Sequence, residues 1–170
     1  MRPRREAREK TVQFLFQHDL NPPSDLNEAL DRFWASQNDV KAQNSKSAPE
    51  KSPEPSESDD GPSITESAVR LFADPLITGV VQHRDEVDEV IRKHARNWDI
   101  NRMAVVDRNV LRLAIFEMLH RDDIPPVVSI NEAVDISKRF STEDSGRFVN
   151  GILDRIKQDL MRPARTSKPD

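Results

Sequence analysis

The sequence predicts an all-α fold in which two small helical bundles share one buried central helix. The segment from Val105 to Arg121 is apolar on almost every side, and such a helix is normally buried among other helices. Outside it, apolar residues recur at helical spacing, and the chain has only 4 glycines, fewer than the tight turns of an α/β fold require. Its 170 residues are enough for one domain with a sizeable core.

The first two helices are defined by apolar stripes and by the residues that start or stop them. One helix is expected from Arg4 to His18, and Asn21-Pro22-Pro23 ends it because proline cannot continue a helix. A second helix is expected from an N-cap at Ser24 to about Trp34.

Residues 36–63 differ in composition from the rest of the chain. Serine, proline and glutamate dominate, and Val40 is the only large apolar residue before the segment ends. Such a segment cannot bury enough surface to offset its ordering entropy. We therefore expect a disordered acidic insertion that interrupts a single domain of residues 1–164, with residues 165–170 as a polar tail.

Helicity is expected to resume near Thr65. Pro75 lies inside this run, where it either kinks the helix or marks a restart capped by Asp74. The next helix is expected over Arg84 to Asn97, with Trp98 facing the core.

The last two helices follow the central one. Residues 122–126 force a break because they end in two prolines, and a helix is expected from Val128 to Phe140. Residues 141–144 then provide an N-cap and first-turn acids for the final helix. Gly151 lies within that helix at a cost of about 1 kcal/mol, which predicts close packing against a neighbouring helix.

The residue types present disfavour catalysis. The chain has no cysteine, which excludes disulfides, thiolate chemistry and sulfur-ligated metals and fits a reducing cytoplasm. No apolar run approaches the roughly 18 residues of a membrane span. None of the histidines has a metal-binding spacing; they are His18, His83, His94 and His120. We expect no enzyme activity, no cofactor and no metal, and we interpret Asp122-Asp123 as a solvated turn rather than an acid–base pair.

The N-terminus is basic although the whole chain carries a net charge of −4. Residues 1–10 contain five basic and two acidic side chains. The arginines are Arg2, Arg4, Arg5 and Arg8. They are either a solvated first turn or a set of bidentate contacts to nucleic-acid phosphate, and their pattern alone does not decide between the two.

A set of motifs, specific in order and spacing, runs through the chain. They are Arg4-Arg5-Glu6-Ala7-Arg8-Glu9 with Gln13, Leu15 and Phe16; Asp107-Arg108; Val110-Leu111-Arg112-Leu113-Ala114 with Glu117; Arg121-Asp122-Asp123-Ile124-Pro125; Ile130-Asn131-Glu132-Ala133-Val134; Thr142-Glu143-Asp144-Ser145; and Phe148-Val149-Asn150-Gly151-Ile152-Leu153-Asp154. Together they resemble the NusB family of bacterial transcription antitermination factors. The insertion is the main departure, because the family normally has a much shorter connection there.

The resemblance implies a non-enzymatic protein that binds boxA-like single-stranded RNA in ribosomal RNA leaders. It implies a partner, NusE, which is also a small-subunit ribosomal protein, and an indirect association with the RNA polymerase elongation complex. The N-terminal arginines would then contact RNA. In the last helix, Arg147 would contact phosphate and Phe148 would stack on an unpaired base, while Asp144 would repel phosphate. The alternative for Phe148 is core packing.

Two further positions match those that the family associates with NusE. They are Phe16 and Asp107. Phe16 lies off the main apolar face of the first helix, so it is either exposed or part of a second buried face. Asp107 is either a partner contact or a first-turn acid that stabilises the central helix.

Two other functions remain compatible with the sequence. One is an RNA-targeting module related to the domain that precedes ribosomal RNA cytosine methyltransferases, although the chain has no room for a methyl-donor domain. The other is a helical protein-interaction module, including a homodimer. The match from Arg4 to Glu9 favours RNA binding over the second.

Overall fold

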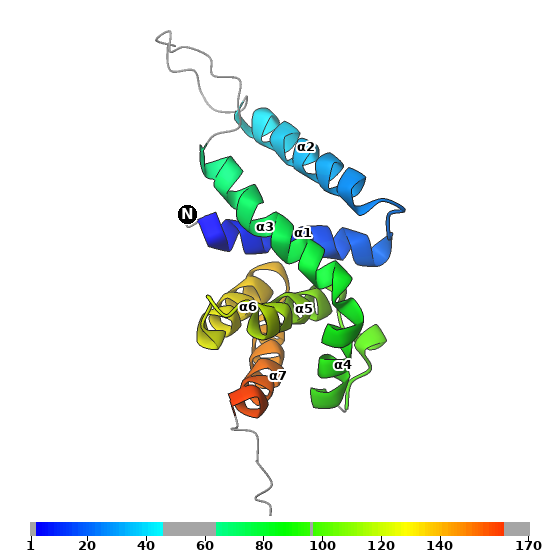
Figure 1. The fold of residues 1–170 in the computed structure, drawn as a ribbon, viewed down its shortest axis with the longest axis vertical. Helices are drawn as coiled ribbons and strands as arrows, with labels where there is room; N and C mark the ends of the chain where they lie inside the picture. Colours follow the sequence, from blue (N-terminus) through cyan, green and yellow to red (C-terminus); the bar gives the residue numbers. More distant parts are fainter. Residues whose placement is uncertain (1–2, 46–63, 96, 162–170) are drawn as a thin grey trace, which may run out of the picture.

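The computed structural model describes residues 3–45, 64–95 and 97–161, and all regular structure in these residues is helical (Figure 1). The elements are α1 (Pro3–Leu20), α2 (Leu26–Ser45), α3 (Ile64–Gln82), α4 (Arg84–His94), the 3-10 helix η1 (Ile100–Arg102), α5 (Val105–His120), α6 (Pro126–Phe140) and α7 (Glu143–Met161). The all-α prediction is confirmed. None of the helices in these ranges has the length and apolarity that crossing a membrane requires.

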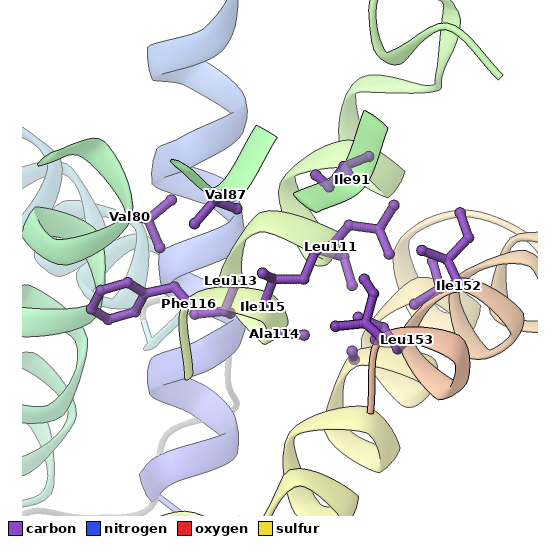
Figure 2. Packing of buried hydrophobic residues seen from close by; sticks show 14 of the residues in the cluster. Val80, Val87, Ile91, Leu111, Leu113, Ala114, Ile115, Phe116, Ile152 and Leu153 are labelled. Atoms are coloured by element: carbon purple, nitrogen blue, oxygen red, sulfur yellow. The ribbon is translucent and has the colours of Figure 1, made fainter. Parts of the chain in front are cut away.

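Helix α5 is the central element of the fold. It contacts α1 and α3 as well as α4, α6 and α7, and every residue from Asn109 to Glu117 is buried. Figure 2 shows α5 side chains such as Leu111 and Ile115 between those of the surrounding helices. The apolar character of this segment is therefore explained by burial on nearly all sides.

A second, smaller apolar cluster joins α1, α2 and α3. Its buried members are Ala7, Phe14, Leu30, Phe33, Trp34, Val69, Ala73 and Ile77. The Phe33 ring meets Phe14 edge-to-face at a centroid distance of 5.5 Å and Trp34 at 5.2 Å, a favourable aromatic arrangement. Helices α1 and α3 contribute to both clusters, and this couples the two bundles.

The predicted disorder of residues 36–63 is wrong for its first part. Helix α2 continues to Ser45, so residues 36–45 are helical. The Gln37 side chain accepts a hydrogen bond from Lys10 of α1, which ties the extension to the bundle. Because this stretch contains no proline, the helix can continue without a large apolar stripe. Residues 46–63 lie outside the described residues.

Short polar side chains cap the starts of α2 and α7. Asp25 Oδ1 accepts a hydrogen bond from the Glu28 amide at 3.2 Å, so Asp25 caps α2 in place of the expected Ser24. Thr142 Oγ1 accepts one from the Ser145 amide at 3.1 Å, which agrees with the predicted cap of α7.

Pro75 lies inside an unbroken α3, so it does not mark a restart.

The glycines within helices differ in how closely they are packed. The prediction of close packing at Gly151 is wrong, because a Cβ added there would meet no atom within 4 Å. Gly79 of α3 is closely packed: an added Cβ would lie 2.1 Å from Phe116 Cζ. Gly79 therefore allows α3 to approach α5.

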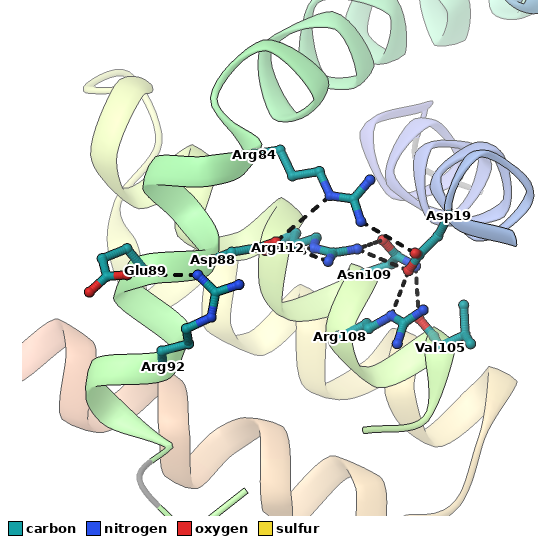
Figure 3. A network of polar contacts seen from close by, with 9 residues as sticks. All are labelled: Asp19, Arg84, Asp88, Glu89, Arg92, Val105, Arg108, Asn109 and Arg112. Carbon is teal, nitrogen blue, oxygen red and sulfur yellow. Dashed lines mark hydrogen bonds and ion pairs between the residues drawn. The ribbon is translucent and has the colours of Figure 1, made fainter. Parts of the chain in front are cut away.

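The polar stripe of the central helix forms a buried ion-pair network (Figure 3). Asp19 Oδ2 accepts hydrogen bonds from Arg108 Nε at 2.6 Å and from Arg112 Nη1 at 2.9 Å. Arg112 also makes a bidentate contact with Asp88 of α4 at 2.7 and 3.1 Å. Burial would raise the pKa of Asp19, but the hydrogen bond from Arg108 and the charge of Arg112 outweigh it and lower this pKa. The network joins the end of α1 to α4 and α5.

Candidate nucleic-acid interface

The structure separates the arginines at the start of the chain into different environments. Arg8 is buried, with 3% of its side chain exposed, and its Nε donates to Glu117 Oε1 at 2.8 Å. The expectation that Arg8 contacts RNA stays a prediction, and in this structure its guanidinium group is the partner of a buried carboxylate. Burial raises the pKa of Glu117, and the charge of Arg8 opposes that increase.

Arg5 connects α1 to α6. Its Nε lies 2.8 Å from Glu132 Oε2, and its Nη2 lies 2.8 Å from Asp135 Oδ2. The hydrogen bond to Glu132 raises the pKa of Arg5. These two carboxylates occupy the guanidinium donors, so an RNA phosphate would have to compete with them.

Among the described arginines at the start of the chain, Arg4 is the exposed one. Its guanidinium group lies over the Phe72 ring at 5.1 Å from the ring centroid, and within the described residues it forms no ion pair. Arg121 approaches the same ring at 5.3 Å, but its guanidinium group is paired with Asp123. Arg2 lies outside the described residues.

A groove lies between the end of α4 and helix α7. It has a volume of about 650 Å³ and is lined by Lys93, His94, Ala95, Asn97, Trp98, Arg147, Phe148, Gly151, Ile152, Arg155, Gln158 and Asp159. Two of the predicted RNA-binding residues, Arg147 and Phe148, therefore lie in one groove. Three of its lining side chains are lysine or arginine, and Oδ2 of the one acid, Asp159, lies 2.5 Å from His94 Nε2.

An aromatic pair forms part of the groove wall. Phe148 is half-buried and packs against the larger core cluster, and its ring meets Trp98 edge-to-face at 5.4 Å. Trp98 is 58% exposed, so the expectation that it faces the core is wrong: α4 ends at His94, and the chain has left the helix before residue 98. The interpretations of Phe148 as a core residue and as a groove residue are both compatible with its position.

Arg147 and Asp144 are solvent-exposed at the start of α7. Arg147 is 78% exposed and Asp144 is 92% exposed, with 3.6 Å between Arg147 Nη1 and Asp144 Oδ1. The carboxylate thus lowers the positive potential that Arg147 contributes to the groove. Arg4 is not among the residues that line this groove, so the structure does not bring Arg147 and Arg4 into one groove.

The two positions associated with a protein partner differ in exposure. Phe16 is half-buried and lines a second groove, of about 580 Å³, between α1 and α2, together with the exposed Leu20. Asp107 is only 8% exposed, and its Oδ2 accepts a hydrogen bond from the Ser145 hydroxyl at 3.2 Å. Burial raises the pKa of Asp107. In this structure Asp107 connects α5 to α7.

Sequence reasoning missed Trp98, Lys93 and Arg155 as groove residues. The only available signal was the spacing of Arg147 and Arg155, which lie two helical turns apart on α7. Trp98 and Lys93 belong to another element, and their approach to α7 depends on how α4 packs.

Comparison with known proteins decides the family. The model of the NusB family matches residues 5–158. The chain belongs to the NusB family. A transcription antitermination protein NusB from Myxococcus xanthus is 41% identical over 160 residues and is matched over 94% of this chain and 98% of its own length. The NusB protein from Thermodesulfovibrio yellowstonii is 38% identical over 163 residues, with 92% of each chain covered.

Solved structures agree with this assignment. NusB from T. maritima superposes with a TM-score of 0.67 at 34% identity, covering 94% of this chain and 93% of that one. A chain in a crystal structure of the antitermination factors NusB and NusE with double-stranded RNA has a TM-score of 0.67 at 27% identity, covering 94% and 98%. The predicted resemblance to the NusB family and its fold is therefore confirmed.

Proposed function

We propose that this NusB-family chain is a non-enzymatic transcription antitermination factor. It binds boxA-like single-stranded RNA in ribosomal RNA leader transcripts together with NusE, and the pair associates with the RNA polymerase elongation complex in the cytoplasm. The observation that carries the proposal is the groove between α4 and α7, where the Trp98–Phe148 pair adjoins basic side chains. The NusB relatives support the antitermination role, and the solved complex of NusB and NusE with double-stranded RNA supports binding of RNA and NusE.

The groove combines the two features that hold single-stranded RNA. Aromatic rings stack on unpaired bases, with about 1–3 kcal/mol lost per base when such a ring is removed. Arginine and lysine contact the backbone, which gives salt-dependent affinity. In our proposal Phe148 and Trp98 stack on bases, and Arg147, Arg155 and Lys93 contact phosphates.

Other parts of the chain have supporting roles in this proposal. The exposed Arg4, together with Arg2, extends the phosphate contacts to the start of α1. Arg5 mainly holds α1 against α6. Phe16 and Leu20 provide the apolar contact with NusE, and Asp107 supports the NusE interface from the start of α5. The core shared by α1 and α3 and the continuous family match over residues 5–158 support one domain over residues 1–164.

The proposal is tested by fluorescence anisotropy of a labelled boxA RNA, titrated with the chain at two salt concentrations, with and without NusE. We expect binding that strengthens with NusE and weakens with salt. Arg147→Ala should weaken binding to RNA alone, whereas Arg32→Ala, which removes a similarly exposed arginine of α2, should not. Absence of binding in every condition would reject the proposal and leave a protein-interaction module.

A further inference from the structure

Three potential metal ligands meet where the turn between α3 and α4 faces the end of α5. Glu86 Oε2 lies 3.2 Å from His83 Nδ1 and 3.3 Å from His120 Nε2. The three ligand atoms, one from each residue, all lie within 4.8 Å of one another. None of the three lies in the RNA groove or in the groove that contains Phe16.

Two of the three separations between these atoms suit a small tetrahedral ion. Zinc binds histidine nitrogen and carboxylate oxygen at about 2.0–2.2 Å. Because the edge of a tetrahedron is about 1.6 times the distance from its centre to a corner, two ligand atoms on zinc lie roughly 3.3 Å apart. The two distances from Glu86 Oε2 agree with that value.

The two imidazole rings pack on the ring of Phe116. His83 and His120 stack with a centroid distance of 4.3 Å, and both stack on the buried Phe116 ring, at 5.9 and 5.1 Å. Phe116 can occupy this position because Gly79 has no side chain. Imidazole lone pairs lie in the ring planes, and these two planes are tilted by only 28°. The rings must therefore rotate out of this stack to direct both nitrogens at one ion.

The neighbouring arginines are directed away from the three ligands. Arg84 points to Asp19 and Asp88, with nitrogen–oxygen distances of 3.5 and 3.7 Å. Arg121 makes a bidentate contact with Asp123 at 2.9 and 3.0 Å. The carboxylate of Glu86 is thus available to balance the charge of a cation.

We propose that His83, Glu86 and His120 form a binding site for Zn²⁺ or a similar divalent transition-metal ion. Two imidazole nitrogens and one carboxylate oxygen are ligands suited to zinc, cobalt, nickel and copper. Water completes the coordination, because the side chains are 31–50% exposed. The ion links the start of α4 to the end of α5 and so stabilises the fold. No spacing in the sequence indicates this site, because His83 and His120 are far apart along the chain.

The test is calorimetric titration of tag-free, chelator-treated full-length chain with ZnCl₂. We expect one ion per chain, with the affinity reduced at least roughly tenfold in His120→Ala and in Glu86→Gln. Glu89→Gln is the matched control, since it removes the same charge from an exposed carboxylate of the same helix and should leave the affinity unchanged. Circular dichroism establishes that each variant is folded.

Two measurements on the unaltered chain complete the test. Zinc at a hundredfold excess over its Kd should raise Tm by about 5 °C or more, and Co²⁺ should develop the visible absorption of a tetrahedral site. The proposal is overturned if the chain binds no zinc below millimolar concentration. It is also overturned if His120→Ala and Glu86→Gln bind zinc as tightly as Glu89→Gln does. Glu86 is then only a hydrogen-bond partner of His120 and an ion-pair partner of His83.

Discussion

Arg8 Nε donates to Glu117 Oε1 at 2.8 Å, and the two side chains are 3% and 1% exposed. This contact joins α1 to the central helix inside the fold. It shows that a cluster of arginines in the sequence does not correspond to one basic surface. Arg4 faces solvent, Arg5 binds α6, and Arg8 neutralises a buried acid.

The buried ion pair should be costly to break but less costly to replace. Arg8→Ala leaves the Glu117 carboxylate without its partner, and we expect a loss of about 3–5 kcal/mol in the free energy of unfolding. The double variant Arg8→Met/Glu117→Leu removes both charges and should recover most of that loss. Urea denaturation measures each value. A double variant no more stable than Arg8→Ala would contradict this account.

Two of the helical glycines, Gly79 and Gly151, should respond in opposite directions to alanine. Gly79→Ala places a Cβ 2.1 Å from Phe116 Cζ, so the rings or helices must shift, and we expect a loss of about 1–3 kcal/mol. Gly151→Ala meets no atom within 4 Å and should gain about 1 kcal/mol from its higher helix propensity. Thermal unfolding of both variants provides the comparison, and equal shifts in Tm would be inconsistent with the close approach of α3 and α5.

The Asp19 network should make the free energy of unfolding depend on pH in the acidic range. Because the pKa of folded Asp19 is lowered from 3.8, its contribution is fully present above that ordinary value and is lost as pH falls through the folded pKa. The stability difference between the wild type and Asp19→Asn should therefore be large at pH 6 and shrink below about pH 4. Urea unfolding at pH 6, 4 and 3 measures the difference. A difference that stays constant would mean that Asp19 is not bound more strongly in its charged form.

Asp144→Asn should bind RNA more tightly. The exposed carboxylate lies 3.6 Å from Arg147 Nη1, so removing its charge raises the positive potential of the groove. We expect a several-fold decrease in Kd that diminishes with salt, measured by RNA titration. Glu143→Gln removes a neighbouring exposed acid as the control. Equal effects of the two substitutions would indicate general charge attraction, and unchanged binding would remove Asp144 from the site.

Phe16→Ala should weaken the response to NusE without changing the binding of RNA alone. The ring lines the groove between α1 and α2, away from the RNA groove, and an aromatic anchor commonly contributes strongly to a protein interface. RNA titrations with and without NusE separate the two effects. Phe140→Ala, which removes another partly exposed ring, serves as the control and should retain the full NusE response.

The sequence was sufficient for the helices and for the central position of α5, because both depend on local apolar periodicity. The apolar residues around Leu111 and Ile115, interrupted only by Arg112, are typical of a buried helix. Composition was a poorer guide at the end of α2. Residues 36–45 form a helix with few apolar side chains, and the contact between Gln37 and Lys10 could not be seen from composition.

The interfaces were predictable only where their residues lie close together in the sequence. Arg147 and Phe148 share one helical turn and line the same groove. Trp98 reaches that groove from another element, and the distinction between Arg4 and Arg8 depends on what α5 places opposite α1. Such pairings are determined by tertiary packing, which local periodicity does not specify.

The central claim is tested most directly by reconstituted transcription on a template that carries boxA upstream of a terminator. Addition of the chain and NusE together should increase the fraction of full-length transcript, and a template with a scrambled boxA should show no increase. Phe148→Ala should reduce the effect on the intact template. An equal increase on both templates, or none on either, would contradict the assignment of this chain as a boxA-dependent antitermination factor.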